Sequence, residues 1–153
     1  MTLETVLLAV GPGDAERSDD LADAVIEVAR PAAATVVLAH VFTQSEYDEV
    51  VTRLEFDDDV DVGPDAVAAR HSTIRDLQAA LEEADVTYEI RGAVGEHGPA
   101  IVDLATDVDA DRVVVGGRRR SPTGKAVFGS TAQEVLLPAP SPVTFVRSDD
   151  VQS

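Results

Sequence analysis

Apolar segments alternate with amphipathic segments along nearly the whole chain, and this alternation restricts the fold more than any other feature. Four segments have the apolar composition of strands and a fifth alternates polar with apolar residues as an edge strand does: Val6–Val10, Val36–Phe42, Thr87–Ile90, Arg112–Gly116 and Val143–Val146. Continuous apolar runs are typical of parallel strands that are covered on both faces. The order predicts an α/β domain: a doubly wound, five-stranded, mostly parallel sheet with helices on both faces.

The segments between the strands predict the helices. Ser18 is expected to cap the first helix, and Pro31 is expected to end it. Pro64 suits the first turn of a single long helix with an apolar inward side. Pro99 is expected to begin a third helix, and the last is predicted after the basic segment, at Ser130–Leu137. The inward residues of the long helix are expected to be Val67, Ile74, Leu77, Leu81 and Ala84.

The acidic segment Thr43–Gly63 is predicted to be an irregular loop. Its centre, Asp57-Asp58-Asp59 followed by Asp61, lacks the spacing, the turn glycine and the closing glutamate of a calcium loop. A solvated acidic loop is therefore expected there. The three histidines have no metal-ligand spacing, so we expect no protein-bound metal. A structural or surface role is expected for His40, His71 and His97, and His40 is the one placed near enough to the cleft proposed below to contact a ligand as an alternative.

Length and composition indicate a single domain and a cytoplasmic location. The 153 residues suit a single unit, with residues 1–147 as the folded core and residues 148–153 as a tail. The chain has no cysteine, which excludes disulfides, thiolate metal sites and cysteine nucleophiles. No apolar run reaches the length of a membrane span, and the first residues lack a basic region that would precede a signal sequence. A cytoplasmic location is expected.

The net charge of −17 argues against nucleic-acid and membrane partners, because both are polyanions. Lys125 is the only lysine, whereas aspartate and arginine are abundant. At molar salt the Debye length is only about 3 Å, so repulsion between exposed carboxylates is largely screened. This composition indicates a salt-rich cytoplasm, such as that of a halophilic archaeon.

The exception to the acidic character is a basic loop after the fourth strand. Four of the 12 basic residues, namely Arg118, Arg119, Arg120 and Lys125, fall within it, and Gly129-Ser130-Thr131 then opens the last helix. Free amides, the helix dipole and the cationic side chains would all attract a phosphate. In a doubly wound sheet this loop would meet the loop after Val10 where the strand order reverses, which is where such sheets bind ligands.

Two common phosphate-binding loops are excluded. A Walker A loop would need glycine at Arg119 and a hydroxyl residue at Ala126. The dinucleotide fingerprint would need a small residue at Glu16, and the carboxylates of Asp14 and Glu16 would repel a pyrophosphate.

The pattern that fits is Gly116, a spacer, and Gly129-Ser130-Thr131. It resembles the universal stress protein family, whose nucleotide-binding members have glycine, two residues, glycine, nine residues, glycine and then serine or threonine. Arg119 stands where the second glycine would be. The resemblance extends over nearly the whole chain and includes Ala39-His40-Val41, the VVVGG strand end and Ser141-Pro142-Val143.

The resemblance implies an adenine nucleotide ligand, with ATP the usual one and Mg²⁺ accompanying it. Carried over residue by residue, the phosphate contacts would be Gly116, Gly129, Ser130 and Thr131, and Val41 would lie beside the base. Gly11 stands where many members have an aspartate that contacts the nucleoside. Two interpretations of Arg119 remain open: its side chain blocks the close backbone approach that glycine permits, or it reaches the phosphates itself with charge-assisted hydrogen bonds.

The resemblance also implies a regulatory homodimer that pairs through the final strand, Val143–Val146, and acts on an unknown protein partner. A nucleotide-independent interaction module is the alternative, and Gly11 and Arg119 favour it. Ser130 also has a purely structural explanation, because Ser130 and Gln133 have the spacing of a capping box. No catalytic residue is predicted, because no motif places a nucleophile, an activated base or paired carboxylates. Slow ATP hydrolysis remains a third alternative.

Overall fold

The computed structural model describes residues 3–11, 14–54, 63–118, 135 and 138–148 of the chain. Within them, five strands form one sheet in the order β3-β2-β1-β4-β5, and every neighbouring pair is parallel. The strands are β1 (Thr5–Val10), β2 (Thr35–Phe42), β3 (Tyr88–Val94), β4 (Arg112–Arg118) and β5 (Val143–Ser148). The predicted doubly wound α/β sheet is confirmed.

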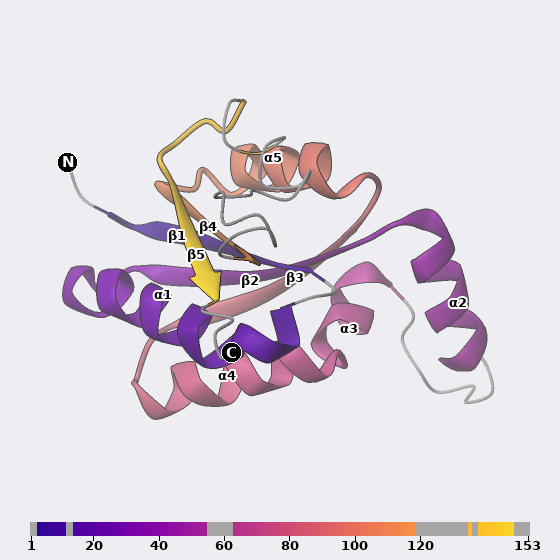
Figure 1. The fold of residues 1–153 in the computed structure, drawn as a ribbon, viewed down its shortest axis with the longest axis horizontal. Helices are drawn as coiled ribbons and strands as arrows, with labels where there is room; N and C mark the ends of the chain where they lie inside the picture. Colours follow the sequence, from indigo (N-terminus) through magenta and orange to yellow (C-terminus); the bar gives the residue numbers. More distant parts are fainter. Residues whose placement is uncertain (1–2, 12–13, 55–62, 119–134, 136–137, 149–153) are drawn as a thin grey trace, which may run out of the picture.

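Helices cover both faces of this sheet (Figure 1). The helical elements are η1 (Asp14–Arg17), α1 (Ser18–Ala32), α2 (Gln44–Leu54), α3 (Pro64–Ala69), α4 (Ser72–Glu83) and α5 (His97–Asp107). Helices α1 and α4 lie on one face and α5 lies on the other, while α2 projects beyond the carboxyl end of the sheet. None of the helices in the described ranges combines the length and the apolarity that crossing a bilayer requires.

The two faces have separate apolar cores because successive side chains of a strand point to opposite sides. On β1, Val6 and Leu8 pack with α1 and α4, while Leu7 and Ala9 pack with α5. All four side chains are almost completely buried, as the continuous apolar runs predict for central parallel strands. The predicted inward residues Val67, Ile74, Leu77 and Leu81 are also buried, and Ala84 packs at the margin of the core.

The prediction of an irregular loop at Thr43–Gly63 is wrong in its first half, because α2 occupies residues 44–54. Thr43 and Glu46 form a reciprocal capping pair. The Thr43 amide donates to Glu46 Oε1 at 2.8 Å, and the Glu46 amide donates to Thr43 Oγ1 at 3.2 Å. This is the capping box, which begins helices with a threonine followed three residues later by a glutamate. The aspartate run at 57–61 lies outside the described residues.

The single long helix predicted from Pro64 is two helices. Pro64 is at the first position of α3, as predicted, but α3 ends at Ala69 and α4 begins at Ser72. His71 causes the new start, because its extended backbone interrupts the helix and its Nδ1 accepts from the Thr73 amide at 3.2 Å. An imidazole therefore does the work that serine or aspartate usually does at a helix start.

The predicted ends of α1 are also corrected. Arg17 is the N-cap residue, and no side-chain hydrogen bond caps the helix, so Ser18 is already in its first turn. Pro31 lies inside α1, which continues to Ala32 and ends at Ala33 in the left-handed conformation (φ 56°). Proline at this position removes one backbone hydrogen bond, to the carbonyl four residues earlier, and the helix continues for only one more residue.

The outer edge of β3 is covered at Gly92. The Gly92 amide donates to Asp65 Oδ1 at 2.7 Å, and a Cβ at this position would overlap the carbonyl oxygen of Pro64. The start of α3 therefore lies directly on the edge strand, which only glycine allows. At the opposite edge, no other described strand pairs with β5 on its outer side.

Candidate functional site

The topological switch point of the sheet lies between β1 and β4, where the chain leaves β1 towards one face and enters β4 from the other. Gly11 directly follows β1, and Gly116 lies in β4, one residue beyond the Ala9–Val115 pair. The strand register places the end of β1 beside β4 at Val115 and Gly116, while most of the basic loop that was predicted to meet the loop after Val10 lies outside the described residues. Ligands of doubly wound sheets bind at such a position.

A buried ion pair fills the α1 side of this switch point. Asp14 and Arg17 are only 4% and 8% exposed, and Arg17 Nη1 donates to Asp14 Oδ1. The second carboxylate oxygen, Oδ2, accepts from the Gly11 amide at 2.7 Å, while the Asp14 amide donates to the Gly11 carbonyl at 3.1 Å. Asp14 is thus held by both a cation and the backbone, which compensates the charge that was expected to repel a phosphate.

Gly116 is required by this ion pair. A Cβ at Gly116 would lie 2.9 Å from Arg17 Cδ, 2.9 Å from Asp14 Oδ1 and 3.3 Å from Leu21 Cδ2. These distances are shorter than ordinary carbon contacts. Glycine is therefore needed at position 116 to leave room for the ion pair on the α1 side. A ligand would approach the backbone of Gly116 from beyond the end of β4.

Val41 presents its backbone and not its side chain to the cleft. The side chain is 2% exposed and packs in the α5-side core. In β2 the Thr35 amide donates to the Glu4 carbonyl, directly before β1, and the Val36 amide donates to the Thr87 carbonyl, directly before β3, so the backbone groups of odd-numbered residues face β1. The register with β1 ends at Val10 opposite His40. The backbone of Val41 therefore lies just beyond the last register pair between β1 and β2.

Three of the seven site residues predicted from the sequence are described, and the structure brings Gly11 and Gly116 together at the switch point with Val41 on the next strand. The other four, together with most of the predicted helix Ser130–Leu137, lie outside the described residues: Arg119, Gly129, Ser130 and Thr131. Two residues of this edge, Asp14 and Arg17, were missed as site residues. Their spacing of three positions, aspartate before arginine, was the available signal for a local ion pair.

The histidines, which look scattered in the sequence, gather beside the carboxyl end of β2. The His40 and His71 rings stack with their centroids 4.2 Å apart, and His97 Nε2 lies 3.2 Å from Glu46 Oε1. His40 also meets the ring of Phe42 edge-on at 4.4 Å. Only the fold reveals this cluster, because its members come from β2, the start of α4 and the start of α5. His71 has a structural role, as expected, because it caps α4, and its ring also packs against that of His40.

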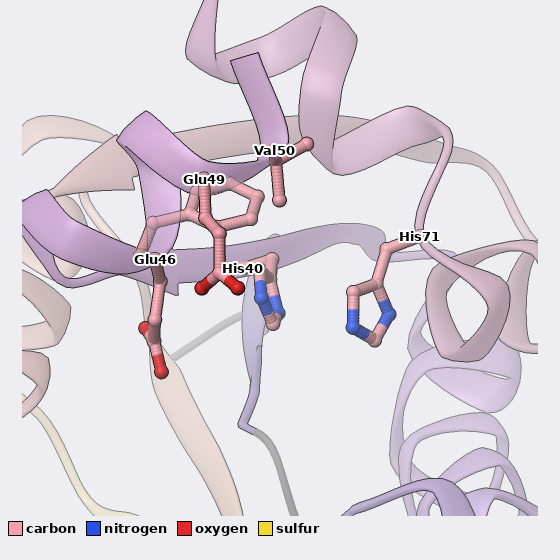
Figure 2. Close-up of a pocket in the computed structure, with 6 residues that line it drawn as sticks. His40, Glu46, Glu49, Val50 and His71 are labelled. Carbon is pink, nitrogen blue, oxygen red and sulfur yellow. The ribbon is translucent and has the colours of Figure 1, made fainter. Parts of the chain in front are cut away.

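A pocket of about 190 Å³ opens beside these rings (Figure 2). It is lined by His40, Phe42, Glu46, Glu49, Val50 and His71. Figure 2 shows the Glu46 and Glu49 side chains reaching down from α2 on one side and His71 on the other. In the part of the chain that the structure describes, no group of three His, Cys, Asp or Glu side chains is arranged to hold a metal ion.

Burial keeps these imidazoles uncharged near neutral pH. Desolvation lowers the pKa of His40 from 6.5 to about 4, with a further contribution from the adjacent His71, and a hydrogen bond to the Val10 backbone opposes the change. Desolvation also lowers the pKa of His71. The pKa of Glu46 is lowered chiefly by its hydrogen bond from the Thr43 backbone. The pocket therefore combines neutral rings with ionised carboxylates.

Comparison with known proteins agrees with this architecture. The model of the universal stress protein family matches residues 2–147. The chain belongs to the universal stress protein family. It is 40% identical over 84 residues to a universal stress protein of Mycolicibacterium smegmatis, a region that is 54% of this chain and 65% of that relative. The match thus spans just under two thirds of the relative's length.

Solved universal stress protein structures have the same fold. One from Archaeoglobus fulgidus is 25% identical and superposes with a TM-score of 0.68, covering 96% of this chain and 100% of the other. A structure from Archaeoglobus fulgidus in complex with dAMP is 23% identical with a TM-score of 0.63, again covering 96% and 100%. At that identity the second likeness supports the fold, and the dAMP belongs to that protein.

Proposed function

We propose that this universal stress protein binds an adenine nucleotide across the carboxyl ends of β1, β2 and β4, and works in the cytoplasm as a homodimeric regulatory protein. The observation that carries the proposal is the meeting of Gly11 and Gly116 at the switch point. The strand end there leads into the basic loop, whose cations suit phosphates. A related fold holds dAMP in the Archaeoglobus fulgidus protein.

The described part of the site is better suited to the base of a nucleotide than to a further charged group. The Val41 carbonyl, at the end of the β1 ladder, would accept a hydrogen bond from the exocyclic amine of adenine. Asp14 is already bound by Gly11 and Arg17, so it would not compete for the phosphates. Phosphate contacts are assigned to Gly116, Gly129, Ser130 and Thr131, with Arg119 alongside and Mg²⁺ on the phosphates. The residues present therefore fit an adenine nucleotide.

Binding without catalysis is the better proposal for this cleft. The carboxylate within the described part of the switch point is Asp14, and both of its oxygens already accept hydrogen bonds. A general base must lie within hydrogen-bond reach of the attacking water, and this carboxylate is only 4% exposed and is held by Gly11 and Arg17. We therefore propose a ligand-controlled regulator and not a nucleotide hydrolase.

The first experiment is to denature the purified protein and identify released nucleotides by mass spectrometry. A stoichiometric adenine nucleotide is expected. The stripped protein should also gain stability with ATP and Mg²⁺, by about 2.7 kcal/mol when the ligand is at 100 times its dissociation constant. A protein that carries no nucleotide and gains no stability from millimolar ATP, AMP or cAMP would overturn the proposal.

The variant Gly129→Asp sharpens this test, because it puts a carboxylate where the phosphates are expected. Nucleotide affinity should fall at least about tenfold, since like charges repel strongly at short range. Gly124→Asp is the matched control, because it adds the same charge to the same loop outside the assigned contacts. Equal effects of the two variants would show that only the charge of the loop matters.

The homodimer is proposed through β5, because this strand forms the edge of the described sheet with no strand beyond it. Phe145→Asp should give a monomer by sedimentation, whereas Thr87→Asp, which adds one charge near the opposite edge, should leave the dimer intact. A wild-type protein that sediments as a monomer would exclude this part of the proposal. If the dimer alone carries the function, Phe145→Asp should abolish activity while Gly129→Asp has no effect.

A further inference from the structure

A second pocket, of about 250 Å³, lies between α2 and α3 at the carboxyl end of β2. Its described lining consists of Phe42, Val50, Arg53, Val67, Arg70 and His71. Phe42 packs with Val67 of α3, whereas Val41, which we place beside the base, packs on the α5 face. Neighbouring residues of a strand point to opposite faces, so a molecule in this pocket would not occupy the position assigned to the base.

The base and one wall of this pocket are apolar. Phe42 and Val67 are almost completely buried and form its base, and the half-buried Val50 extends the apolar surface towards solvent. The pocket adjoins that of Figure 2 through Phe42, Val50 and His71, which line both. Sites for drug-sized ligands usually enclose about 300–1,000 Å³, so this volume suits a smaller molecule with one ring or a branched chain.

Every polar side chain among the described lining residues is an N–H donor. Arg53 and Arg70 are exposed, so a molecule that enters from solvent can reach their guanidinium groups, which have no acceptor atom. His71 Nδ1 accepts from the Thr73 amide at 3.2 Å, which leaves the hydrogen of the neutral ring on Nε2. A ligand of this pocket would therefore have to supply the acceptors.

The two arginines are not held in close ion pairs. Arg53 Nη2 lies 3.8 Å from Glu49 Oε1, and both side chains are strongly exposed, so this pair is worth little. Arg70 forms no salt bridge with a described residue. The chain has 29 acidic against 12 basic residues, and most of its surface repels anions. Two available cations beside one apolar surface therefore favour an anion at this place.

We propose that this pocket binds a small carboxylate that has one aromatic ring or a branched apolar body. The planar guanidinium fork matches the two oxygens of a carboxylate, which would accept from Arg53 and Arg70. The apolar body would pack on Val50 and over Phe42. This site is independent of the nucleotide cleft, so either proposal can fail without the other.

A purely structural role of the arginines is the alternative that the test separates. Arg53 lies in the last turn of α2 and Arg70 is the C-cap residue of α3, where a cation offsets the helix dipole. Arg30 lies in the last turn of α1 in the same way, but it is not among the residues that line this pocket. Arg30 is therefore the matched control.

The test compares phenylacetate with 2-phenylethanol, phenethylammonium and acetate. Amide NMR spectra of the intact protein at pH 7.5 should show saturable binding of phenylacetate at millimolar concentration, with shifts at Val50 and Arg70 and none at Gly11. 2-Phenylethanol should bind at least about fivefold more weakly, and phenethylammonium and acetate at least about tenfold.

Three results would overturn the proposal. Equal affinity for 2-phenylethanol would exclude the role of charge. Shifts at Gly11 would place phenylacetate in the nucleotide cleft. No binding of phenylacetate at about 10 mM would exclude a carboxylate site of useful affinity.

Single variants locate the anion. Arg70→Gln should weaken phenylacetate about fivefold, whereas Arg30→Gln should leave its affinity unchanged. Glu49→Gln should strengthen binding about twofold, because it removes the carboxylate that competes for Arg53. Equal affinities of wild type and Arg70→Gln would assign the arginines to the helix ends alone and overturn the proposal.

The chain's own aspartates at 57–59 are a competing source of carboxylates, because they follow Arg53 closely in the sequence. The triple variant Asp57→Asn, Asp58→Asn and Asp59→Asn tests them. It should bind phenylacetate within about threefold of the wild type, since exposed charges in salt act only at short range. Binding by the triple variant and none by the wild type would overturn the proposal in favour of these aspartates.

Discussion

The carboxyl end of the sheet buries two polar clusters in different ways. At the end of β1, Asp14 and Arg17 form a buried ion pair directly under Gly116. At the end of β2, His40 and His71 stack and remain uncharged, because burial lowers the pKa of both rings. The first cluster is a pair of opposite charges, and the second consists of uncharged rings.

The comparison shows that the two clusters respond to different disturbances. A buried ion pair is little affected by salt, since both partners are shielded, but it does not tolerate the loss of one partner. A buried neutral imidazole tolerates substitution by another ring, but not protonation. Each difference can be measured.

The largest effect is expected from Arg17→Met, which keeps the length of the side chain and leaves the Asp14 carboxylate buried without its cation. The free energy of unfolding should fall by about 3–5 kcal/mol, as for other broken buried pairs. Denaturant unfolding monitored by circular dichroism measures this.

The double variant Asp14→Leu with Arg17→Met is the control, because it removes both charges together. It should recover most of the lost stability, since an apolar replacement of a buried pair is often neutral. A double variant as unstable as Arg17→Met alone would show that packing, and not the unpaired charge, dominates.

The next effect concerns pH. The unfolded His40 titrates near 6.5 and the folded residue near 4, so between these values the unfolded chain binds more protons. Stability from this residue is therefore constant above pH 6.5 and decreases as the pH falls to 4, by about 3 kcal/mol in total. Unfolding curves collected from pH 7.5 to 4 measure the loss.

The matched variant His40→Phe keeps the aromatic contacts and cannot be protonated. Because many carboxylates titrate in the same range, the informative quantity is the difference between the two pH profiles. That difference should change between pH 6.5 and 4 and be flat above. Parallel profiles throughout the range would contradict the low pKa of His40.

A smaller effect is expected from Gly116→Ala, which pushes a methyl group against Arg17 and Asp14. Overpacking of this kind typically costs about 1–3 kcal/mol. Gly11→Ala is the control at the same switch point, because its Cβ would lie 3.7 Å from Asp14 Oδ2, an ordinary contact. If the two alanine variants have equal melting temperatures, the close packing of the ion pair under β4 is wrong.

The smallest effect is expected from Thr43→Val, which has the same shape but lacks the hydroxyl that caps α2. The loss should be about 1 kcal/mol. Hydrogen exchange should increase in the first turn of α2 and not in α4, which has its own cap at His71. An unchanged exchange pattern would show that packing holds α2 in place at the wall of the histidine pocket.

The strands and their parallel order were predictable, because each apolar run had to be covered on both sides. The helices were less predictable where a helix cap was not recognised in the sequence. Thr43 and Glu46 had a legible capping signature, so α2 could have been predicted. The interruption at His71 could not, since histidine rarely caps a helix and the apolar spacing continues across it.

The candidate site was predictable only where local sequence determines it. The glycines after β1 and in β4 stood at strand ends, and topology alone brings strand ends together. The stacking of His40 on His71 depends on the exact place where α4 begins, and nothing near either residue in the sequence reports it. The three-residue spacing of Asp14 and Arg17 was visible in the sequence. The burial of this ion pair was not, because it depends on the absence of a side chain at Gly116.

The contact of α3 with β3 limits how this sheet can grow. At Gly92 the outer edge is occupied by the Pro64 carbonyl and the Asp65 carboxylate, so a strand from another copy cannot add there. Among the described strands, β5 is therefore the edge left for pairing with a second copy. If the proposed dimer pairs there, neither β5 nor the covered edge of β3 offers the described sheet a further strand to extend it, and the assembly would stop at two copies.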